Sequence, residues 1–421
     1  MCAISTLEFP AIPLPANGVR RFHVMVKPVG AICNLNCAYC YYLHKQELLG
    51  SEQRFRMSDE ILETHIRQYI EQQDGDEVIF TWQGGEPTLL GLEFFEKVVA
   101  LEKKYKKPNQ RIENDLQTNG TLLNDEWCRF LKQNRFLVGL SIDGPEELHD
   151  RYRVAKDGRP TFKKVFAASQ LLHRHGIRFN SLTVINRENA KRPLDVYRFL
   201  KREVRPFQMQ FIPCVEPKEF RSVAPQHWPP ESLPVMGASA ARPGTPDSIV
   251  TDWSVDPDDW GYFLCKVWDD WFSRDYGKVF VNLFETAVAQ WMGKDAQICV
   301  YHEFCGKAAA LEHDGSLYSC DHYVYPEYRL GNIAGQNSAE MIFSRRQQEF
   351  GFSKFLSLPP RCRDCEYLFA CNGECPKNRL LRTPEGDAGL SYLCSGLKRF
   401  WEHIDHDMVE IRKRVKGEQK Y

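Results

Sequence analysis

The first half of the chain alternates short apolar runs with longer amphipathic stretches. The apolar runs have the length of strands and lie at residues 22–29, 77–82, 111–118, 136–142, 178–185 and 207–215. Between them, apolar positions recur with the helical period at residues 58–73, 91–106, 124–133, 161–175 and 192–202. Residues 58–73 open on Ser58, a favoured N-cap. Strands that alternate with helices predict parallel βα units, which build their sites at the carboxyl ends of the strands.

The pattern changes after residue 218. Prolines interrupt residues 219–256 repeatedly, so we expect a long irregular insertion that is mobile or lies over the site. Helical periods return at 258–274, 282–292 and 395–415. Residues 299–394 are loop-rich, with one hairpin predicted from 308–311 and 317–319 around an Asp-Gly turn. A segment with so few core residues needs a staple, which its cysteines can supply.

These patterns divide the chain into six parts. We expect an N-terminal arm (1–21), a βα domain (22–217), the proline-rich insertion (218–256), a helical connection (257–298), a cysteine-stapled domain (299–394) and a C-terminal helix (395–421).

Composition narrows the classes of function. Lys and Arg number 55 and Asp and Glu 56, which gives a formal charge of −1 and no global reason to bind nucleic acid or an anionic membrane. A hydrophobic fraction of 43% is enough for a sizeable core. No stretch approaches the ~18–20 apolar residues of a spanning helix, and residues 1–15 lack the features of a secretory signal. We therefore expect a cytoplasmic protein that binds neither nucleic acid nor membrane.

Fifteen cysteines are the strongest chemical signal in the chain. In a reducing cytoplasm, clustered cysteines bind metal or do chemistry more often than they form disulfides. Cys33, Cys37 and Cys40 form C-x3-C-x2-C directly after the first predicted strand. Three thiolates on one loop can hold three irons of a four-iron cluster and leave the fourth iron open. The alternative is a zinc ion with His44 as its fourth ligand.

The loops after later strands carry further candidates. Gly84-Gly85-Glu86 follows the second strand, where glycines permit close backbone approach and the carboxylate can bind an ammonium group. Ser141 ends the fourth strand and can bind a ribose or carboxylate oxygen. Arg153 can pair with a carboxylate through two hydrogen bonds. Taken alone, these are a tight turn, a strand end and a surface arginine.

The C-x3-C-x2-C loop, with Tyr39 before its last cysteine, resembles the radical S-adenosylmethionine superfamily. The resemblance implies a partial (β/α)6 barrel that binds a [4Fe–4S] cluster and S-adenosylmethionine. It also implies that the Gly84-Gly85-Glu86 element takes the methionine amino group, and that Ser141 and Arg153 contact the cofactor. The remaining implied contacts of the adenine and methionine parts are Tyr39, Gly85 and Val215.

Eight more cysteines lie in the last third of the chain. They are Cys299, Cys305, Cys320, Cys362, Cys365, Cys371, Cys375 and Cys394. Eight thiolates make two sets of four, and spacing alone would group Cys375 with Cys371. Two zinc ribbons are the alternative to iron, although the longer spacings do not match a simple ribbon.

This second set resembles the SPASM auxiliary-cluster domain, and the whole arrangement resembles the anaerobic sulfatase-maturating enzymes. The resemblance implies two interleaved [4Fe–4S] sites, in addition to the first cluster. One would be held by Cys299, Cys305, Cys320 and Cys375, and the other by Cys362, Cys365, Cys371 and Cys394. It also implies that Asp321 is the catalytic base that deprotonates the substrate side chain.

The implied reaction is the oxidation of a cysteine or serine in a sulfatase to Cα-formylglycine. A 5′-deoxyadenosyl radical would remove a Cβ hydrogen, and the second electron would leave through the auxiliary clusters. The implied partners are an unfolded or nascent sulfatase polypeptide and an electron donor such as a flavodoxin or ferredoxin.

Three alternatives remain open at this stage. The chain is another SPASM enzyme that forms thioether or carbon–carbon crosslinks in a peptide, a regulator of sulfatases, or a non-catalytic zinc-binding protein. The four remaining cysteines are expected to be small hydrophobic residues without a role in chemistry; they are Cys2, Cys128, Cys214 and Cys265.

Overall fold

The computed structural model describes residues 21–49 and 56–418, with side chains up to residue 414. Almost all of the expected N-terminal arm lies outside these residues, as does Cys2. None of the helices in the described residues is both long and apolar enough to cross a membrane.

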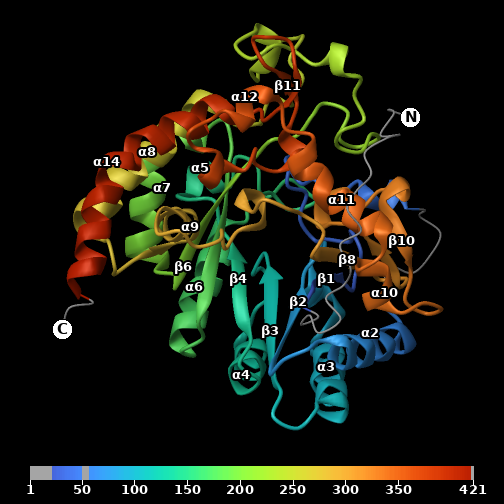
Figure 1. Cartoon of the computed structure of the whole chain (residues 1–421). Helices are drawn as coiled ribbons and strands as arrows, with labels where there is room; N and C mark the ends of the chain where they lie inside the picture. Colours follow the sequence, from blue (N-terminus) through green and yellow to red (C-terminus); the bar gives the residue numbers. More distant parts are fainter. Residues whose placement is uncertain (1–20, 50–55, 419–421) are drawn as a thin grey trace.

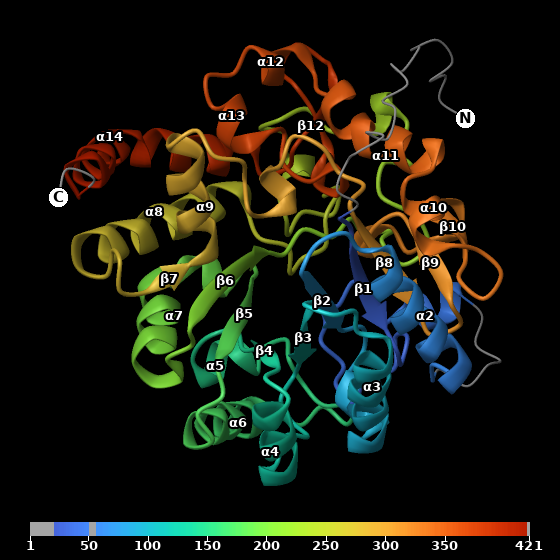
Figure 2. The same ribbon diagram turned by 60° about the horizontal axis from the view of Figure 1, so that its bottom comes forward.

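Six parallel strands follow one another in sequence order across the sheet (Figures 1 and 2). They are β1 (His23–Lys27), β2 (Glu77–Trp82), β3 (Arg111–Thr118), β4 (Leu137–Ser141), β5 (Phe179–Ile185) and β6 (Gln208–Pro213). Each lies within a predicted run, so the expected α/β fold is confirmed. The sheet stays open in the structure. An open sheet is what a partial barrel requires.

Helices cover the outer face of these strands, as Figure 2 shows. They are α2 (Asp59–Gln72), α3 (Leu92–Tyr105), α4 (Asp125–Gln133), α6 (Phe162–Arg174) and α7 (Pro193–Phe199), with the short α1 (Lys45–Leu48) and α5 (Glu146–His149). The N-caps explain where two of them begin. Ser58 Oγ accepts a hydrogen bond from Ile61 N at 3.2 Å, and Asn124 Oδ1 accepts one from Trp127 N at 2.9 Å.

The second half of the chain extends the same sheet at both edges. β7 (Phe280–Val281) pairs with β6, and β8 (Ala308–Glu312) pairs with β1 in parallel. β9 (Ser316–Tyr318) and β10 (Arg329–Asn332) follow as antiparallel strands. The predicted hairpin is therefore present. Its pairing with β1 was not predicted, because strand propensity does not identify a partner almost three hundred residues away.

Longer helices frame the cysteine-rich part. They are α8 (Pro257–Arg274), α9 (Asn282–Trp291), α11 (Arg345–Leu356) and α14 (Cys394–Glu418), with the short α10 (Ser338–Ile342), α12 (Pro360–Arg363) and α13 (Leu368–Cys371). The sequence pattern missed α11. Its buried face carries Gln347, Gly351 and Lys354, so the apolar periodicity that marks an amphipathic helix is absent.

Residues 219–256 are irregular, with only the short 3-10 turns η4 (Pro230–Ser232) and η5 (Ser239–Ala241). Backbone hydrogen bonds nevertheless hold the segment against its neighbours. Thr251 N donates to Glu216 O at 2.9 Å, and Arg382 N, in the small hairpin of β11 (Leu381–Arg382) and β12 (Ala388–Leu390), donates to Pro234 O at 2.9 Å. Of the two expectations, an insertion that lies over its neighbours fits better than a mobile one.

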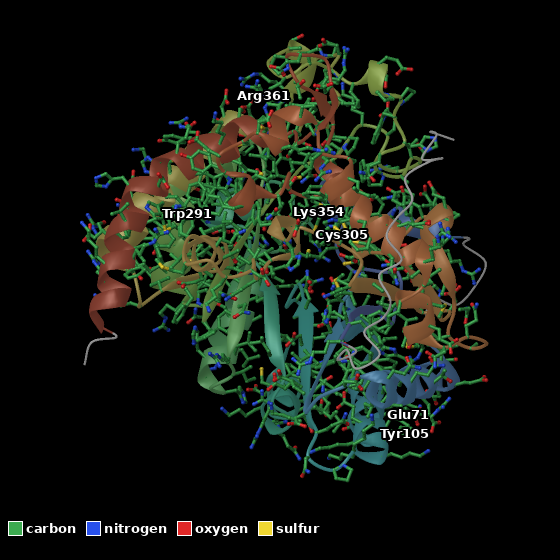
Figure 3. All side chains as sticks on the ribbon, viewed as in Figure 1. Glu71, Tyr105, Trp291, Cys305, Lys354 and Arg361 are labelled. Atoms are coloured by element: carbon green, nitrogen blue, oxygen red, sulfur yellow. The ribbon has the colours of Figure 1, made fainter. Side chains whose placement is uncertain are left out.

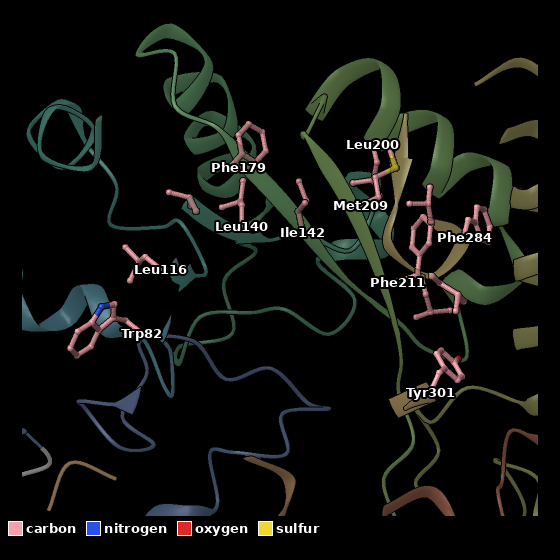
Figure 4. Close-up of a cluster of buried hydrophobic side chains, with 14 of the residues drawn as sticks. Trp82, Leu116, Leu140, Ile142, Phe179, Leu200, Met209, Phe211, Phe284 and Tyr301 are labelled. Atoms are coloured by element: carbon pink, nitrogen blue, oxygen red, sulfur yellow. The ribbon is translucent and has the colours of Figure 1, made fainter. Parts of the chain in front are cut away.

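The core runs along the strands and continues into the helices beyond β6 (Figure 4). Trp82 from β2, Leu116 from β3 and Leu140 from β4 are fully buried. Phe284 from α9 and Tyr301, in the turn η6 (Cys299–Tyr301), belong to the same cluster. One continuous core therefore holds the βα part and the cysteine-rich part against each other.

α8 and α14 cross at two glycines. A Cβ on Gly261 would lie 2.7 Å from Gly396 Cα, and one on Gly396 would lie 1.9 Å from Pro257 O. Both are closer than packed atoms approach, so only glycine permits this crossing. Because Cys394 is the first residue of α14, the crossing also fixes the position of that thiol.

We expect Gly396→Ala to destabilise the fold by about 1–3 kcal/mol, since the added methyl group must push the two helices apart. Gly335→Ala is the matched control, because a Cβ there meets nothing within 4 Å. Helical circular dichroism during urea unfolding measures both variants. An unchanged midpoint for Gly396→Ala would show that the helices separate without cost.

Candidate functional site

The first cysteine loop lies at the carboxyl end of β1 and is held by the segment that carries Arg153. Asn36 N donates to Val154 O at 2.8 Å, and Ala38 N donates to Tyr152 O at 3.1 Å. Leu35 N points at Cys33 Sγ, 3.3 Å away. The fold therefore brings Arg153, more than a hundred residues away in sequence, beside the three thiols.

The three thiols of this loop are close enough to influence one another. Burial raises the pKa of Cys37 to about 12; the charge of Arg153 opposes this, and the neighbouring charges of Cys40 and Cys33 add to it. Burial likewise raises the pKa of Cys33 to about 11 and also raises that of Cys40. A group that binds these thiols as thiolates must therefore bring positive charge, as iron does.

Arg153 has an unused donor beside this loop. Its Nη1 donates to Tyr39 Oη at 2.8 Å and lies 3.9 Å from Asp143 Oδ1, while its buried Nε has no hydrogen-bond partner. Tyr39 Oη in turn donates to Asp143 Oδ2. A buried guanidinium with an orphaned N–H fits the carboxylate of a bound amino-acid group.

Gly84 and Gly85 pack directly against the start of the cysteine loop. A Cβ on Gly85 would lie 1.9 Å from Ile32 O, and one on Gly84 would lie 2.9 Å from Gly30 O. Gly85 N donates to Gly30 O, and Glu86 N donates to Ile32 O, both at 2.8 Å. The glycines therefore fix the position of the loop, a use that the sequence pattern left open.

Glu86 is fully buried and already engaged. Its Oε1 accepts from Thr88 N, Thr88 Oγ1 and Thr118 Oγ1 at 3.1, 2.6 and 2.7 Å. Its Oε2 accepts from Asn119 N at 2.7 Å. Burial raises the pKa of this carboxyl, and these hydrogen bonds oppose the shift. Glu86 therefore joins the ends of β2 and β3, and Oε2 keeps a lone pair for an ammonium group.

Ser141 and Val215 lie at the same end of the sheet as the cysteine loop. Ser141 is the last residue of β4 and is buried. Val215 follows β6, and its carbonyl accepts a hydrogen bond from Lys377 Nζ at 2.6 Å. The carboxyl ends of β1, β2, β4 and β6 therefore share one edge, as the sequence pattern predicted for parallel strands.

The eight later cysteines fall into two groups in space. After burial, the largest influences on the pKa of Cys320 are the charges of Cys375, Cys299 and Cys305, which raise it. The pKa of Cys371 is likewise raised by Cys394 and Cys362, and that of Cys394 by Cys362 and Cys365. This grouping separates Cys371 from its sequence neighbour Cys375, and the assignment of each implied set of four to one cluster stays a prediction.

Two buried cations lie beside these groups. Lys354 of α11 donates to the carbonyl oxygens of Cys299 and Val300 at 3.1 and 2.9 Å, and to that of His302. Figure 3 labels Lys354 next to Cys305. Arg379 donates to Gly373 O at 3.1 Å and opposes the rise in the pKa of Cys362. Both cations suit anionic thiolate clusters, and the sequence pattern identified neither.

Asp321 lies between the first cysteine loop and the later cysteines. Its Oδ1 forms an ion pair with Lys27 of β1, and its Oδ2 accepts a hydrogen bond from Tyr41. Burial alone would raise the pKa of this carboxyl, but the charges of Lys27 and His322 and the hydrogen bonds from Lys27 and Tyr41 together outweigh that effect and hold the pKa below its usual value. Asp321 is therefore an ionised carboxylate in a buried position, able to accept a proton.

Sequence reasoning missed the partners of Asp321. Lys27 is 1% exposed and lies 4.5 Å from the ring centre of Tyr42, whose hydroxyl donates to Glu312. The available signal was a lysine that ends an otherwise apolar strand. Asp143 was missed as a partner of Arg153 because Asp143-Gly144 also fits an ordinary turn.

A narrow pocket opens beside this network. Tyr41 and His322 line it on the side of Asp321, and the buried ion pair Glu216–Lys377, at 2.6 Å, lines another side. Phe220 of the insertion also lines it. The base candidate, the first cysteine loop and the insertion therefore meet at one place.

His44, the fourth ligand in the zinc alternative, packs against Phe220 and Tyr325, two rings that line the narrow pocket. Its ring packs against Phe220 at 5.1 Å, and burial lowers its pKa to about 3. In the described part of the chain, no three His, Cys, Asp or Glu side chains converge in the way that a single metal ion requires. A four-iron cluster makes no such demand, because its thiolates sit on separate irons.

Comparisons with known proteins agree with this geometry. Residues 28–200 match the family model of the Radical SAM superfamily, and residues 299–366 match that of an iron–sulfur cluster-binding domain. The serine-type anaerobic sulfatase-maturating enzyme of Bacteroides thetaiotaomicron is 45% identical over 95% of this chain and 93% of its own length. The cysteine-type enzyme of Clostridium perfringens is 32% identical over 93% of this chain and 99% of its own. A solved structure of native anSMEcpe with bound AdoMet and Cp18Cys peptide matches with a TM-score of 0.80 at 30% identity, covering 94% of this chain and 100% of that chain.

We expect the triple change of Cys33, Cys37 and Cys40 to Ala to lower the iron content of reconstituted protein by about one third, since one of three clusters loses its ligands. S-adenosylmethionine cleavage should disappear with it. The matched control replaces Cys128, Cys214 and Cys265 by Ala and should keep all the iron. Iron analysis and 5′-deoxyadenosine assays measure both, and full iron content in the first variant would overturn the ligand assignment.

Proposed function

Because the chain belongs to the anaerobic sulfatase-maturating enzyme family of the radical SAM superfamily, we propose that it oxidises a serine or cysteine of a sulfatase polypeptide to Cα-formylglycine. Identity of 45% over nearly the whole chain supports this reaction. The observation that carries it is the position of Asp321 between the two cysteine-rich regions. Membership of an enzyme family also removes the non-catalytic zinc-binding alternative.

The family's cofactors are S-adenosylmethionine and three [4Fe–4S] clusters, and the residues present fit them. Cys33, Cys37 and Cys40 would hold the first cluster. The orphaned Nε of Arg153 would bind the methionine carboxylate. When bound, these cofactors supply the radical that removes a Cβ hydrogen from the substrate and the route by which the second electron leaves. The two later cysteine sets would hold the auxiliary clusters.

The chain itself supplies proton transfer and orientation. Asp321 would accept the proton of the substrate hydroxyl or thiol as the Cβ hydrogen is lost, which leaves an aldehyde from serine and a thioaldehyde from cysteine. Water would then hydrolyse the thioaldehyde to the aldehyde and release hydrogen sulfide. Lys27 and Tyr41 keep the carboxylate ionised and fix its direction. The narrow pocket would shield the reaction from water, which protects a radical reaction from side products.

The partners follow from the same chemistry. The substrate would be an unfolded or nascent sulfatase segment, because a buried site does not admit a folded surface. The single electrons would come from a small redox protein such as a flavodoxin or ferredoxin. The reducing cytoplasm is the proposed location, since it keeps the ligand thiols free of disulfides.

Mass spectrometry of an oxygen-free reaction tests the proposed function. Reconstituted protein, a reductant and S-adenosylmethionine are incubated with paired peptides that carry Cys-x-Pro-x-Arg or Ser-x-Pro-x-Arg. We expect formylglycine in at least one peptide, only when S-adenosylmethionine is present. If 5′-deoxyadenosine forms and both peptides stay unchanged, the substrate assignment is wrong and a crosslinking SPASM enzyme becomes the better reading.

Asp321→Asn should lower the rate of formylglycine formation by about 10²–10⁴-fold, because the amide keeps the shape and loses the proton acceptor. Iron content should not change. The control is Asp314→Asn. Asp314 is a carboxylate in the turn between β8 and β9, the hairpin that precedes Asp321. Equal rates for the Asp321 variant and the unaltered protein would exclude Asp321 as the base.

A further inference from the structure

The proline-rich insertion forms an open groove on the outer side of the narrow pocket. The groove has a volume of about 530 Å³ and is lined by Lys218, Arg221, Thr245, Asp252 and Trp253, with Phe220 at one end. Phe220 also lines the pocket beside Asp321. The ring of Phe220 therefore lines both the pocket and the groove, so a polypeptide bound in the groove lies next to the pocket.

The position of Phe220 is fixed by the cysteine-rich part. Its carbonyl accepts a hydrogen bond from Tyr325 Oη at 2.7 Å, and its ring packs against His44 at 5.1 Å. Tyr325 itself lines the pocket. The partition between pocket and groove is therefore a built feature of the site.

The groove carries an unused positive charge. Lys218 Nζ donates to Thr245 O and Pro246 O at 3.3 and 2.9 Å, which holds the far wall in place. Arg221 is exposed, and within the described residues no acidic side chain lies in ion-pair range of it. Lys218 and Arg221 carry two positive charges and Asp252 carries one negative charge, so the lining of the groove has a net positive charge.

The groove also offers the contacts that an extended backbone uses. Trp253 contributes an aromatic wall, and its Nε1 is buried without a hydrogen-bond partner. An aromatic wall and an exposed guanidinium without an acidic partner among the described residues match an extended polypeptide with acidic side chains better than a small anion.

We propose that this groove binds an acidic flanking segment of the substrate polypeptide, next to the residue that is oxidised in the pocket, and that Arg221 selects for its negative charge. The proposal rests on the proposed function. It makes the insertion a specificity element that distinguishes polypeptides beyond the modified motif.

The test compares peptides of two lengths on the reconstituted protein. The short peptide carries only the Ser-x-Pro-x-Arg or Cys-x-Pro-x-Arg core. The long peptides extend it on one side or the other by about ten residues, which reach roughly 35 Å when extended. Each extension is made in a Glu-containing and a Lys-containing version. Formylglycine formation gives KM and kcat, and fluorescence anisotropy of labelled peptides gives binding.

We expect the Glu-containing extension on one side to lower KM about five-fold relative to the short peptide, as exposed ion pairs do, with kcat unchanged. In the Arg221→Glu variant, the KM of the peptide with the Glu-containing extension should be close to that of the short peptide. The peptide with the Lys-containing extension should then have the lower KM. Arg221→Lys should retain the preference for Glu. The matched control is Lys163→Glu, because the side chain of Lys163 on α6 is 85% exposed and lies outside the groove.

The outcomes separate the two proposals. If no peptide acquires formylglycine, the proposed function fails. If formylglycine forms and neither extension lowers KM, or if the gain survives Arg221→Glu, the groove proposal alone is overturned. A mass that rises with protein concentration and falls in the Arg221→Glu variant would assign the groove to a second copy of this chain, and would also overturn it.

Discussion

The parallel pairing of β1 with β8 is the constraint on which the site depends. The register places Lys27 opposite Glu312, so the last residue of β1 and the last residue of β8 reach the same edge of the sheet. The cysteine loop continues from one strand, and the hairpin that leads to Cys320 and Asp321 continues from the other. Without this pairing, Asp321 would have no fixed position relative to Cys40, and the ion pair with Lys27 would not form.

The site is built from buried charges, which is costly for a fold and useful for its chemistry. Lys27 with Asp321, Arg153 with Asp143, and Lys377 with Glu216 are all ion pairs within the protein. Each ion loses several kcal/mol of hydration, and only good geometry compensates for that loss. Removing one partner of such a pair costs about 3–5 kcal/mol, so the charges hold one another in a single arrangement. Rigidity of this kind suits a reaction in which side chains must not collapse onto a reactive centre.

The sequence predicted most of the scaffold and the identity of the cysteines, and it missed the contacts between distant parts. Ser58 and Asn124 mark the starts of their helices in the sequence, because the hydrogen bond that an N-cap side chain accepts comes from a backbone N–H only three residues away. Lys354 and Asp143 gave no such signal, and the signal for Lys27 was no more than a lysine at the end of an apolar strand. Their importance arises from burial beside groups far along the chain, which periodicity does not report. The separation of Cys371 from Cys375 was implied by the resemblance and not by spacing, which pointed the other way. In the fold the two thiols have different cysteine neighbours.

The order in which the ribosome synthesises the chain also matters for Lys27 and the strand that carries it. β1 emerges early, and its partner β8 follows only after the whole βα domain, the insertion and the helical connection. Domains fold largely from the N-terminus as they are made, so one side of β1 remains an unpaired sheet edge during that interval. An inward-pointing charge at a sheet edge is a device by which natural proteins discourage edge-to-edge aggregation. Lys27, which pairs with Asp321 in the finished protein, is a charge of this kind at the end of β1.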